Sequence, residues 1–273
     1  MNAREAAAEL APRLAAAGVA DARFEAEYLV RMAAGISRTE YFLDYQLCRE
    51  QRARLGEFAG RRLEREPAAY IHGEREFYGL VFEVSPEVLV PRPETELLVE
   101  VALRECARLT APLVVDVGTG SGAIAVAVSH HLGRETVTGI DTSSRALAVA
   151  RRNAERHAAC VRFVRGDLLA AARRADVVLA NLPYVPGAEI AGLEPEVRDW
   201  EPRLALDGGE DGLDLIRRLV DDCAKRIRPR LLALEVGLGQ AATVAARCQR
   251  GGARTEILAD LAGIQRVVCA RWA

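Results

Sequence analysis

The amino-acid sequence predicts an α/β protein in which a small helical bundle and a β-hairpin precede a parallel sheet covered by helices on both faces. Three observations support this fold class. Apolar residues recur at three-to-four spacing over residues 1–66, which is the period of amphipathic helices. Aromatic and β-branched residues follow Glu74, and short apolar runs alternate with helical segments after Pro112. We therefore expect a helical bundle at residues 1–73, a β-hairpin linker at 74–92 and an α/β domain at 93–273.

Four helical segments are expected in the bundle. The apolar positions of the first two are Leu10 and Leu14, then Phe24, Tyr28, Leu29 and Met32. The third segment runs from Ser37 to Leu47 and the fourth from Glu50 to Leu63. Ser37 and Glu40 have the spacing of a capping box, and Pro67 stops the helical run.

The β-hairpin is expected from a change in residue type after Glu74. Its apolar positions are Phe77, Leu80, Phe82, Val84, Val88, Leu89 and Val90. Gly79 and the pair Ser85-Pro86 are turn signals between them. The segment Pro91–Glu96 follows, where two prolines restrict the chain before a helix that we expect from Glu94 to Arg108.

The α/β domain is expected from a series of short apolar strands. The buried strands are predicted at Leu113–Val117, Thr136–Ile140, Val161–Val164, Val177–Ala180 and Leu231–Val236. A helix should end near His131, and another should run from Ser143 to about His157. Two last strands, around Thr255–Leu258 and Gln265–Ala270, are joined by a short turn and are expected to pair antiparallel.

Composition excludes several classes of protein. The chain has 273 residues, a formal net charge of −2, 50% hydrophobic residues and 28% charged residues, which argues against a disordered protein. No apolar run approaches the roughly 18 residues of a membrane span, so we expect no membrane helix. Acids near the N-terminus argue against a signal peptide.

The basic residues and the cysteines also indicate no special partner. All but one of the 37 basic residues are arginine, and they are spread along the chain among 39 acids, so we do not expect direct nucleic-acid binding. The six cysteines lie far apart and without metal-ligand spacing. We expect no metal site, and we expect the cysteines to be buried small side chains in a reducing compartment, which predicts a cytoplasmic protein.

The first candidate site is the glycine-rich run Asp116–Gly122, which connects a predicted strand to a helix. The candidate cofactor-binding residues in it are Gly118, Thr119, Gly120, Ser121 and Gly122. Glycines let the backbone turn sharply and let a ligand approach its amide groups. The G-x-G-x-G spacing and the preceding acid favour S-adenosylmethionine over a dinucleotide, because a carboxylate suits a cationic amino-acid group and not a pyrophosphate. A dinucleotide site and a turn without a ligand are the alternatives for this loop alone.

Acidic residues also follow the next two strands. Asp141 ends the second strand, where a carboxylate can accept hydrogen bonds from both hydroxyls of a ribose. Asp167 and Leu168 follow the third strand, where the carboxylate could accept from the exocyclic amine of adenine. A helix cap and a plain turn are the alternatives for the two aspartates. Because the carboxyl ends of parallel strands meet at one edge, the three strand ends together predict a ligand pocket.

The most specific candidate is the run Asn181-Leu182-Pro183-Tyr184, which follows the predicted strand Val177–Ala180. A planar NH₂ group is a poor nucleophile because its lone pair is delocalised. The Asn181 side-chain oxygen and the Leu182 carbonyl can accept its two hydrogens and orient its nitrogen towards a methyl donor. Pro183 restricts Leu182, and Tyr184 can stack on the flat group. A plain strand-end turn is the alternative.

With these residues in view, nearly the whole chain resembles the HemK/PrmC family of protein-(glutamine-N5) methyltransferases, which modify peptide-chain release factors. The motifs that carry the resemblance are Tyr70-Ile71, Gly73-Glu74, Val90–Glu96, Asp116–Gly122, Asp141, Asn181–Tyr184, Glu201-Pro202 and Asp207–Asp214. The segment Val90–Glu96 and the Gly-Gly-x-Asp-Gly loop within Asp207–Asp214 are much more specific than the glycine-rich turn.

The resemblance implies a Rossmann-like, seven-stranded class I S-adenosylmethionine-dependent methyltransferase domain after a helical domain that recognises the substrate. The implied reaction moves a methyl group to the side-chain nitrogen N5 of the glutamine in the Gly-Gly-Gln motif of class 1 release factors, and it leaves S-adenosylhomocysteine. We also expect a monomer. The implied cofactor-binding residues are Gly118, Thr119, Gly120, Ser121, Gly122, Asp141, Asp167, Leu168 and Asn181. The implied residues around the glutamine amide are Asn181, Leu182, Pro183 and Tyr184.

One position departs from the family pattern. The family usually reads Asn-Pro-Pro-Tyr, and here Leu182 replaces the first proline, which keeps the carbonyl acceptor but removes a constraint on the loop. Asn-Leu-Pro-Tyr also occurs in ribosomal-RNA adenine dimethyltransferases. The same transfer to nitrogen could act on other substrates, and the alternatives are a ribosomal-protein glutamine, an adenine in nucleic acid and a small metabolite. A nicotinamide-dependent oxidoreductase and a non-catalytic scaffold are the alternatives from other classes.

Overall fold

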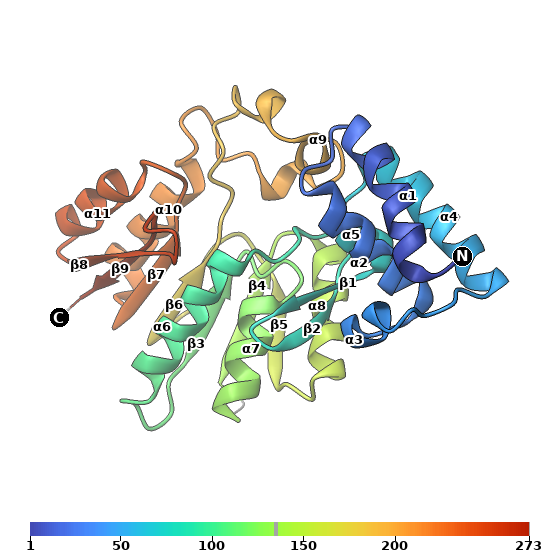
Figure 1. The fold of residues 1–273 in the computed structure, drawn as a ribbon. Helices are drawn as coiled ribbons and strands as arrows, with labels where there is room; N and C mark the ends of the chain where they lie inside the picture. The colour runs from blue at the N-terminus through green and yellow to red at the C-terminus, as the bar shows by residue number, and fades with distance from the viewer. Residues whose placement is uncertain (134–135, 273) are drawn as a thin grey trace. The chain divides into compact units, whose positions relative to one another are not determined.

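The computed structural model describes residues 1–133 and 136–272, which form two compact units (Figure 1). The first unit combines Met1–Gly73 with the short segment Glu194–Trp200. The second unit combines Glu74–Leu193 with the chain from Glu201 onward. None of the helices in these described ranges is both long and apolar enough to cross a membrane.

The first unit is built from short helices around one apolar core. Its helices are α1 (Ala3–Ala16), α2 (Ala22–Ala34), α3 (Arg38–Phe42), α4 (Arg49–Leu63), α5 (Ala68–His72) and α9 (Pro195–Arg198). A capping box starts α1, because the Asn2 side chain accepts from the Glu5 amide and the Glu5 carboxylate accepts from the Asn2 amide. Leu14 and Val30 are fully buried in the core, as their helical spacing predicts.

The third helix begins as predicted but ends early. Ser37 and Glu40 form the predicted capping box. The expectation that the helix continues to Leu47 is wrong, because Asp44 adopts a left-handed φ of 57° and the Leu47 amide donates to the carbonyl of Met1 instead of a helical partner. The apolar spacing therefore extends past the end of the helix.

A buried ion-pair network joins α9 to α4 within the first unit. Arg62, whose side chain is 5% exposed, donates to Glu25 at 3.1 Å and to Glu196 at 2.8 Å. Arg65 donates to the other carboxylate oxygen of Glu196 at 2.5 Å. Burial disfavours the ionised form of Glu196, but the hydrogen bonds from Arg65 and Arg62 hold its pKa below the usual value. The sequence pattern contains no signal for this pairing across more than a hundred residues.

The β-hairpin packs within the second unit. Its strands are β1 (Glu74–Phe77) and β2 (Leu80–Glu83), and they pair antiparallel around a Tyr78-Gly79 turn. Phe77 and Phe82 are buried in one of the two cores of that unit. The buried side chain of Asn153 accepts from the Glu83 amide at 2.7 Å and donates to the Glu83 carbonyl at 3.0 Å.

The predicted continuation of the hairpin through Val88–Val90 is wrong. The strand β2 ends at Glu83, and residues 88–90 form no strand. Val88 and Val90 are almost fully buried, so their apolar character reflects packing and not sheet pairing. The amide of Val90 donates to the Glu201 carboxylate at 3.4 Å, which takes the place of a ladder partner.

The second unit contains a seven-stranded sheet that is parallel except at one edge. Its strands are β3 (Val114–Val117), β4 (Val137–Asp141), β5 (Val161–Arg165), β6 (Val177–Ala180), β7 (Leu231–Glu235), β8 (Arg254–Ala259) and β9 (Gln265–Arg271). The strand order is β5-β4-β3-β6-β7-β9-β8, and β9 runs antiparallel to both of its neighbours. The predicted α/β class and the antiparallel pairing of the last two strands are confirmed.

Helices cover both faces of this sheet (Figure 1). One face carries α6 (Glu96–Cys106), α7 (Ala123–Leu132) and α8 (Ser144–Arg156), and the other carries α10 (Asp214–Asp222) and α11 (Ala241–Arg250). A short 3₁₀ turn, η1 (Pro93–Thr95), precedes α6, and the connections also contain η2 (Ile190–Gly192), η3 (Arg203–Ala205) and the π-helical turn η4 (Cys223–Ile227). Alternate strand residues point to opposite cores, with Val114 on the α6 side and Val115 on the α10 side. Burial on both faces explains why β3, β6 and β7 read as continuous apolar runs. The expectation of a buried strand at Val161–Val164 is wrong, because every residue of β5 is half-buried or exposed.

The cysteines only partly match their prediction. Cys106, Cys223, Cys248 and Cys269 are buried as expected, and burial raises the pKa of the Cys269 thiol to about 11. The expectation of burial is wrong for Cys48 and Cys160, which are exposed. Among the described residues, no cluster of three or more histidine, cysteine or acidic side chains has a metal-binding arrangement.

Candidate active site

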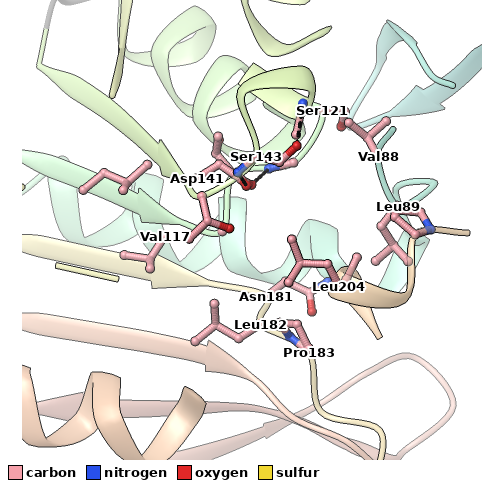
Figure 2. A pocket seen from close by; sticks show the side chains of 18 of the residues that line it. Val88, Leu89, Val117, Ser121, Asp141, Ser143, Asn181, Leu182, Pro183 and Leu204 are labelled. Atoms are coloured by element: carbon pink, nitrogen blue, oxygen red, sulfur yellow. Dashed lines mark hydrogen bonds between the residues drawn. The ribbon is translucent and has the colours of Figure 1, made fainter. Parts of the chain in front are cut away.

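A cavity of about 400 Å³ lies at the carboxyl ends of β3, β4 and β6. This volume falls in the range of small-molecule sites. The sequence-predicted residues that line it are Gly118, Thr119, Gly120, Ser121, Asp141, Asp167, Leu168, Asn181, Leu182 and Pro183. Figure 2 shows Asp141 and Asn181 at the strand ends, with Val88 and Leu89 on the opposite side of the cavity. Gly122 and Tyr184, both in the described part of the chain, lie outside the lining.

The glycine-rich loop is shaped by close contacts that exclude side chains. Gly118 has a φ of 73°, and a Cβ there would lie 3.0 Å from the Cδ2 atom of Leu182. Gly122 has a φ of 81°, and its Cβ would lie 3.1 Å from that of Ala150. Gly122 therefore lets α7 begin close to α8, while Gly118 brings the backbone close to the Asn181 loop. The Ser121 carbonyl accepts from Asn153, which also holds the hairpin.

Asp141 organises two backbone segments at the end of β4. Its Oδ2 accepts from the Gly120 amide at 2.9 Å, and its Oδ1 accepts from the Ser143 amide at 2.8 Å. The cap of α8 is supplied by Ser143, whose hydroxyl accepts from the Ala146 amide at 3.1 Å. Asp141 therefore does not cap α8. It lines the cavity, and each of its carboxylate oxygens can accept a further hydrogen bond.

Asp116 lies beneath the loop and outside the cavity lining. It is fully buried, and its Oδ2 accepts from the Thr119 hydroxyl at 2.6 Å. Burial raises the pKa of Asp116 to about 7, although the bond from Thr119 opposes the shift. Its carboxylate therefore holds the glycine-rich loop from beneath.

Asp167 and Leu168 line the cavity on the side of β5. The Asp167 carboxylate accepts from the Arg218 guanidinium at 2.5 Å through one oxygen. Leu168 is buried and adopts a left-handed φ of 47°, which turns the chain sharply after Asp167. One oxygen of the Asp167 carboxylate is thus engaged by Arg218, and the Asp167 backbone carbonyl accepts from the Ala170 amide at 3.0 Å.

The Asn181 loop brings an amide side chain to the cavity next to the glycine loop. The Asn181 Nδ2 donates to the Thr95 hydroxyl at 3.1 Å. The Leu182 side chain is 4% exposed and packs into the core beside Gly118. Leucine at this position therefore adds apolar contact where the family pattern has proline.

Tyr184 stands apart from the cavity. Its carbonyl accepts from the Gln240 side chain at 2.9 Å, and its ring lies close to Gly237. Burial and the nearby Glu235 raise the pKa of the Tyr184 phenol to about 12, so the phenol is neutral at ordinary pH.

Two acids that lack a sequence-assigned role support the cavity wall. Glu235 ends β7 and accepts from the Thr95 hydroxyl at 2.6 Å, with both side chains buried. Glu201 is also buried, and it accepts from the Val90 amide and from Arg92 at 2.6 Å. For Glu235, the available signal was its place near the carboxyl end of an apolar strand, and for Glu201 it was the Glu201-Pro202 motif of the resemblance.

The Gly-Gly-x-Asp-Gly loop braces the chain that leaves the Asn181 loop. The Gly208 amide donates to the Val185 carbonyl at 2.9 Å, and the Val185 amide donates to the Leu206 carbonyl at 3.0 Å. A Cβ on Gly212 would lie 2.2 Å from the Tyr184 carbonyl oxygen. This glycine therefore allows two backbones to meet directly.

Comparison with known families matches both parts of the chain. Residues 5–73 match the PrmC N-terminal domain, and residues 93–193 match the methyltransferase small domain. The release factor glutamine methyltransferase of Geobacter sulfurreducens is 43% identical over 264 residues, covering 94% of this chain and 92% of the relative. The enzyme of the same name from Moorella thermoacetica is 42% identical over 275 residues and covers 97% of each chain.

Comparison with solved structures agrees with the fold. The crystal structure of a ribosomal protein L11 methylase from Lactobacillus delbrueckii subsp. bulgaricus aligns with a TM-score of 0.51 and 16% identity. The alignment covers 70% of this chain and 84% of that one. At this identity the likeness is one of fold alone.

Proposed function

The chain belongs to the family of release factor glutamine methyltransferases, and on that premise we propose that it methylates the Gly-Gly-Gln glutamine of class 1 peptide-chain release factors with S-adenosylmethionine as the methyl donor. The observation that carries the proposal is the shared cavity. Asn181 and Leu182, which suit a planar amide, line the same cavity as the glycine loop and Asp141, which suit a nucleoside.

The residues present fit S-adenosylmethionine. Asp141 keeps free acceptor capacity for a ribose diol, and Gly118 and Gly120 leave room for close approach to their backbone. Asp167 and Leu168 would hold the adenine end, and Asn181 would border the methyl group. When bound, S-adenosylmethionine supplies a methyl group on a positively charged sulfur.

The protein's contribution is to position and polarise the substrate amide. The Asn181 Oδ1 and the Leu182 carbonyl would accept the two amide hydrogens, and Pro183 restricts the backbone that aims this carbonyl. Two acceptors favour a pyramidal nitrogen as its bond to carbon forms. No strong base is required, because the methylated nitrogen is positively charged and loses its proton readily.

The wider assignment follows from the same premise. We assign residues 1–73 to recognition of the release factor and residues 93–273 to catalysis, with residues 74–92 as the β-hairpin linker between these two domains. The enzyme would act as a monomer in the cytoplasm, where release factors work. Its net charge of −2 gives no general attraction to nucleic acid or to an anionic membrane surface, so neither is part of the proposal.

The test is mass spectrometry of a purified release factor after incubation with the full-length protein and S-adenosylmethionine. We expect one added methyl on the Gly-Gly-Gln glutamine, and we expect none with Asn181→Ala, because this variant lacks an acceptor for the amide. Binding of S-adenosylhomocysteine, measured by calorimetry, should remain within a few-fold of wild type in that variant. No methylation by wild-type protein with intact cofactor binding would reject the substrate, and near-normal turnover by Asn181→Ala would reject the role of Asn181.

A further inference from the structure

A buried hydrogen-bonded chain leads away from the proposed amide site. The Asn181 Nδ2 donates to the Thr95 Oγ1 at 3.1 Å, and the Thr95 Oγ1 donates to the Glu235 Oε2 at 2.6 Å. Thr95 is 4% exposed and Glu235 is 2% exposed. Asn181 directly follows β6, Thr95 ends η1 and Glu235 ends β7, and all three belong to the second unit.

The donors and acceptors in this chain allow only one direction when Glu235 is ionised. A carboxylate can only accept, so the single hydroxyl hydrogen of Thr95 must point to Glu235. The Thr95 oxygen then has only lone pairs left, and Asn181 must offer its NH₂ group to it. The Asn181 carbonyl oxygen is consequently directed to the other side of the side chain.

We infer that Thr95 and Glu235 are positioning residues that orient the Asn181 side chain so that its oxygen, and not its nitrogen, meets the amide hydrogens of the substrate. This inference rests on the proposed function and names two residues that act through Asn181. A reversed Asn181 would set its NH₂ group against the NH₂ group of the substrate. The two orientations have almost the same shape, so packing alone cannot select the productive one.

The surroundings of Glu235 connect this orientation to pH. Burial raises the pKa of Glu235 to about 7, while Thr95, Arg266 and Arg92 lower it and Glu94 raises it. The neutral phenol of Tyr184 lies close enough to be influenced by Glu235. A protonated Glu235 could donate to Thr95, and the Thr95 hydrogen could then be donated to the oxygen of a reversed Asn181. The productive orientation is therefore enforced only while Glu235 is ionised, and we expect kcat to fall as the pH drops through about 7.

The test compares three substitutions in the full-length protein. Thr95→Val keeps the shape but removes the hydroxyl, and we expect kcat to fall roughly 10- to 100-fold, the size expected for one lost orienting hydrogen bond in a closed site. The affinity for S-adenosylhomocysteine should stay within about threefold. Thr95→Ser keeps the hydroxyl and should recover most of the loss. Glu235→Gln should remove the rise of kcat with pH near pH 7.

A spectroscopic measurement separates this inference from the proposed function. In the ¹⁵N–¹H spectrum of the full chain, the Asn181 side-chain NH₂ pair is assigned by its absence in Asn181→Ala. We expect this pair to shift in Thr95→Val and to stay near its wild-type position in Thr95→Ser. This result would support the orientation even if wild-type protein left the release factor unmethylated, an outcome that would reject the substrate alone.

Three outcomes would overturn the inference. The first is an unshifted Asn181 pair in Thr95→Val, and the second is near-normal kcat in that variant. The third is an equal loss of kcat in Thr95→Val and Thr95→Ser together with lost cofactor affinity, which would indicate a merely structural role. If Thr95→Val does not fold, Glu235→Gln decides alone: a flat pH profile supports the inference and an unchanged profile overturns it.

Discussion

Individual carboxylates hold much of the candidate site in place. Asp141 bonds the Gly120 amide with one oxygen and the Ser143 amide with the other, and it still lines the cavity. Each carboxylate oxygen has two lone-pair directions, so the same group can hold the loop and accept from a ribose. Asp167 differs, because a partly exposed Arg218 already occupies one of its oxygens.

Asp141→Ala should weaken cofactor binding strongly. It removes the carboxylate that accepts from the Gly120 and Ser143 amides and that is the proposed ribose acceptor. We therefore expect the dissociation constant of S-adenosylhomocysteine to rise roughly 10- to 100-fold, given the usual strength of hydrogen bonds to a charged group. Isothermal titration calorimetry measures this directly. The matched comparison is Asp167→Ala, which should raise this dissociation constant by a smaller factor. Equal losses in the two variants would contradict the larger role of Asp141.

The site residues that the sequence predicts are placed by the strand directly before them, whereas those that it misses meet only through long-range packing. Asp141 and Asn181 directly follow apolar strands, and a parallel sheet brings such positions together, so their meeting was predictable. Thr95 and Glu235 are separated by 140 residues, and their bond depends on how α6 packs beside β7. A pattern of neighbouring residues contains no information on that packing. Their roles therefore needed the structure.

At the scale of elements, the Gly-Gly-x-Asp-Gly loop acts as a brace for the Asn181 loop. Hydrogen bonds join residues 206–209 to Val185 and Gly187, just after the Asn181 run. The closest approach is at Gly212, where the backbone has a φ of 78° and faces the Tyr184 carbonyl. A rigid brace suits a loop in which Leu182 stands where the family pattern has its first proline.

Gly212→Ala should destabilise the protein and reduce activity together. The new Cβ would lie 2.2 Å from a backbone oxygen that cannot move aside cheaply, and the left-handed backbone adds strain, so we expect a loss of at least about 2 kcal/mol in the free energy of unfolding. Urea unfolding and methyl transfer measure the two effects. Gly192→Ala is the control, because nothing lies within 4 Å of its Cβ position, and it should stay within about 0.5 kcal/mol.

The elements themselves were predictable where burial and pairing coincide. The strands β3, β6 and β7 are buried on both faces and read as apolar runs, so the sequence predicts them closely. Val88–Val90 has the same apolar character but is buried by side-chain packing without a partner strand. The short helix α9 has no buried residue to reveal it. Apolar residues indicate burial, and only their context distinguishes strand from loop.

For the molecule as a whole, two buried acids should set the pH dependence of stability. Burial raises the pKa of Asp116 and of Glu235 to about 7 in the folded protein. Between the ordinary carboxyl range and pH 7, the folded state therefore holds protons that the unfolded state has released. Stability should be highest at the low end of this window and should fall as the pH rises to about 7.

The measurement is a series of urea unfolding midpoints between about pH 5 and about pH 8. The Glu235→Gln variant has no ionisable group at position 235, so its unfolding midpoint should change less with pH than that of the wild type. Asp116→Asn should flatten the remaining slope in the same direction. A wild-type midpoint that rises steadily over this range would show that neither acid retains its proton in the folded state. As the pH rises towards about 7, we therefore expect the stability to fall while kcat rises because Glu235 becomes ionised.

The membership of Glu194–Trp200 in the helical unit has a consequence for how this protein can be taken apart. The chain passes between the units at residues 73–74, 193–194 and 200–201, so a single proteolytic cut at any one of these points breaks one of three covalent connections between the units and leaves the other two. A fragment that stops at Gly73 lacks Glu196, the shared partner of Arg62 and Arg65. A recombination event that exchanges this unit between related genes must therefore carry two separate stretches of coding sequence, one of them very short.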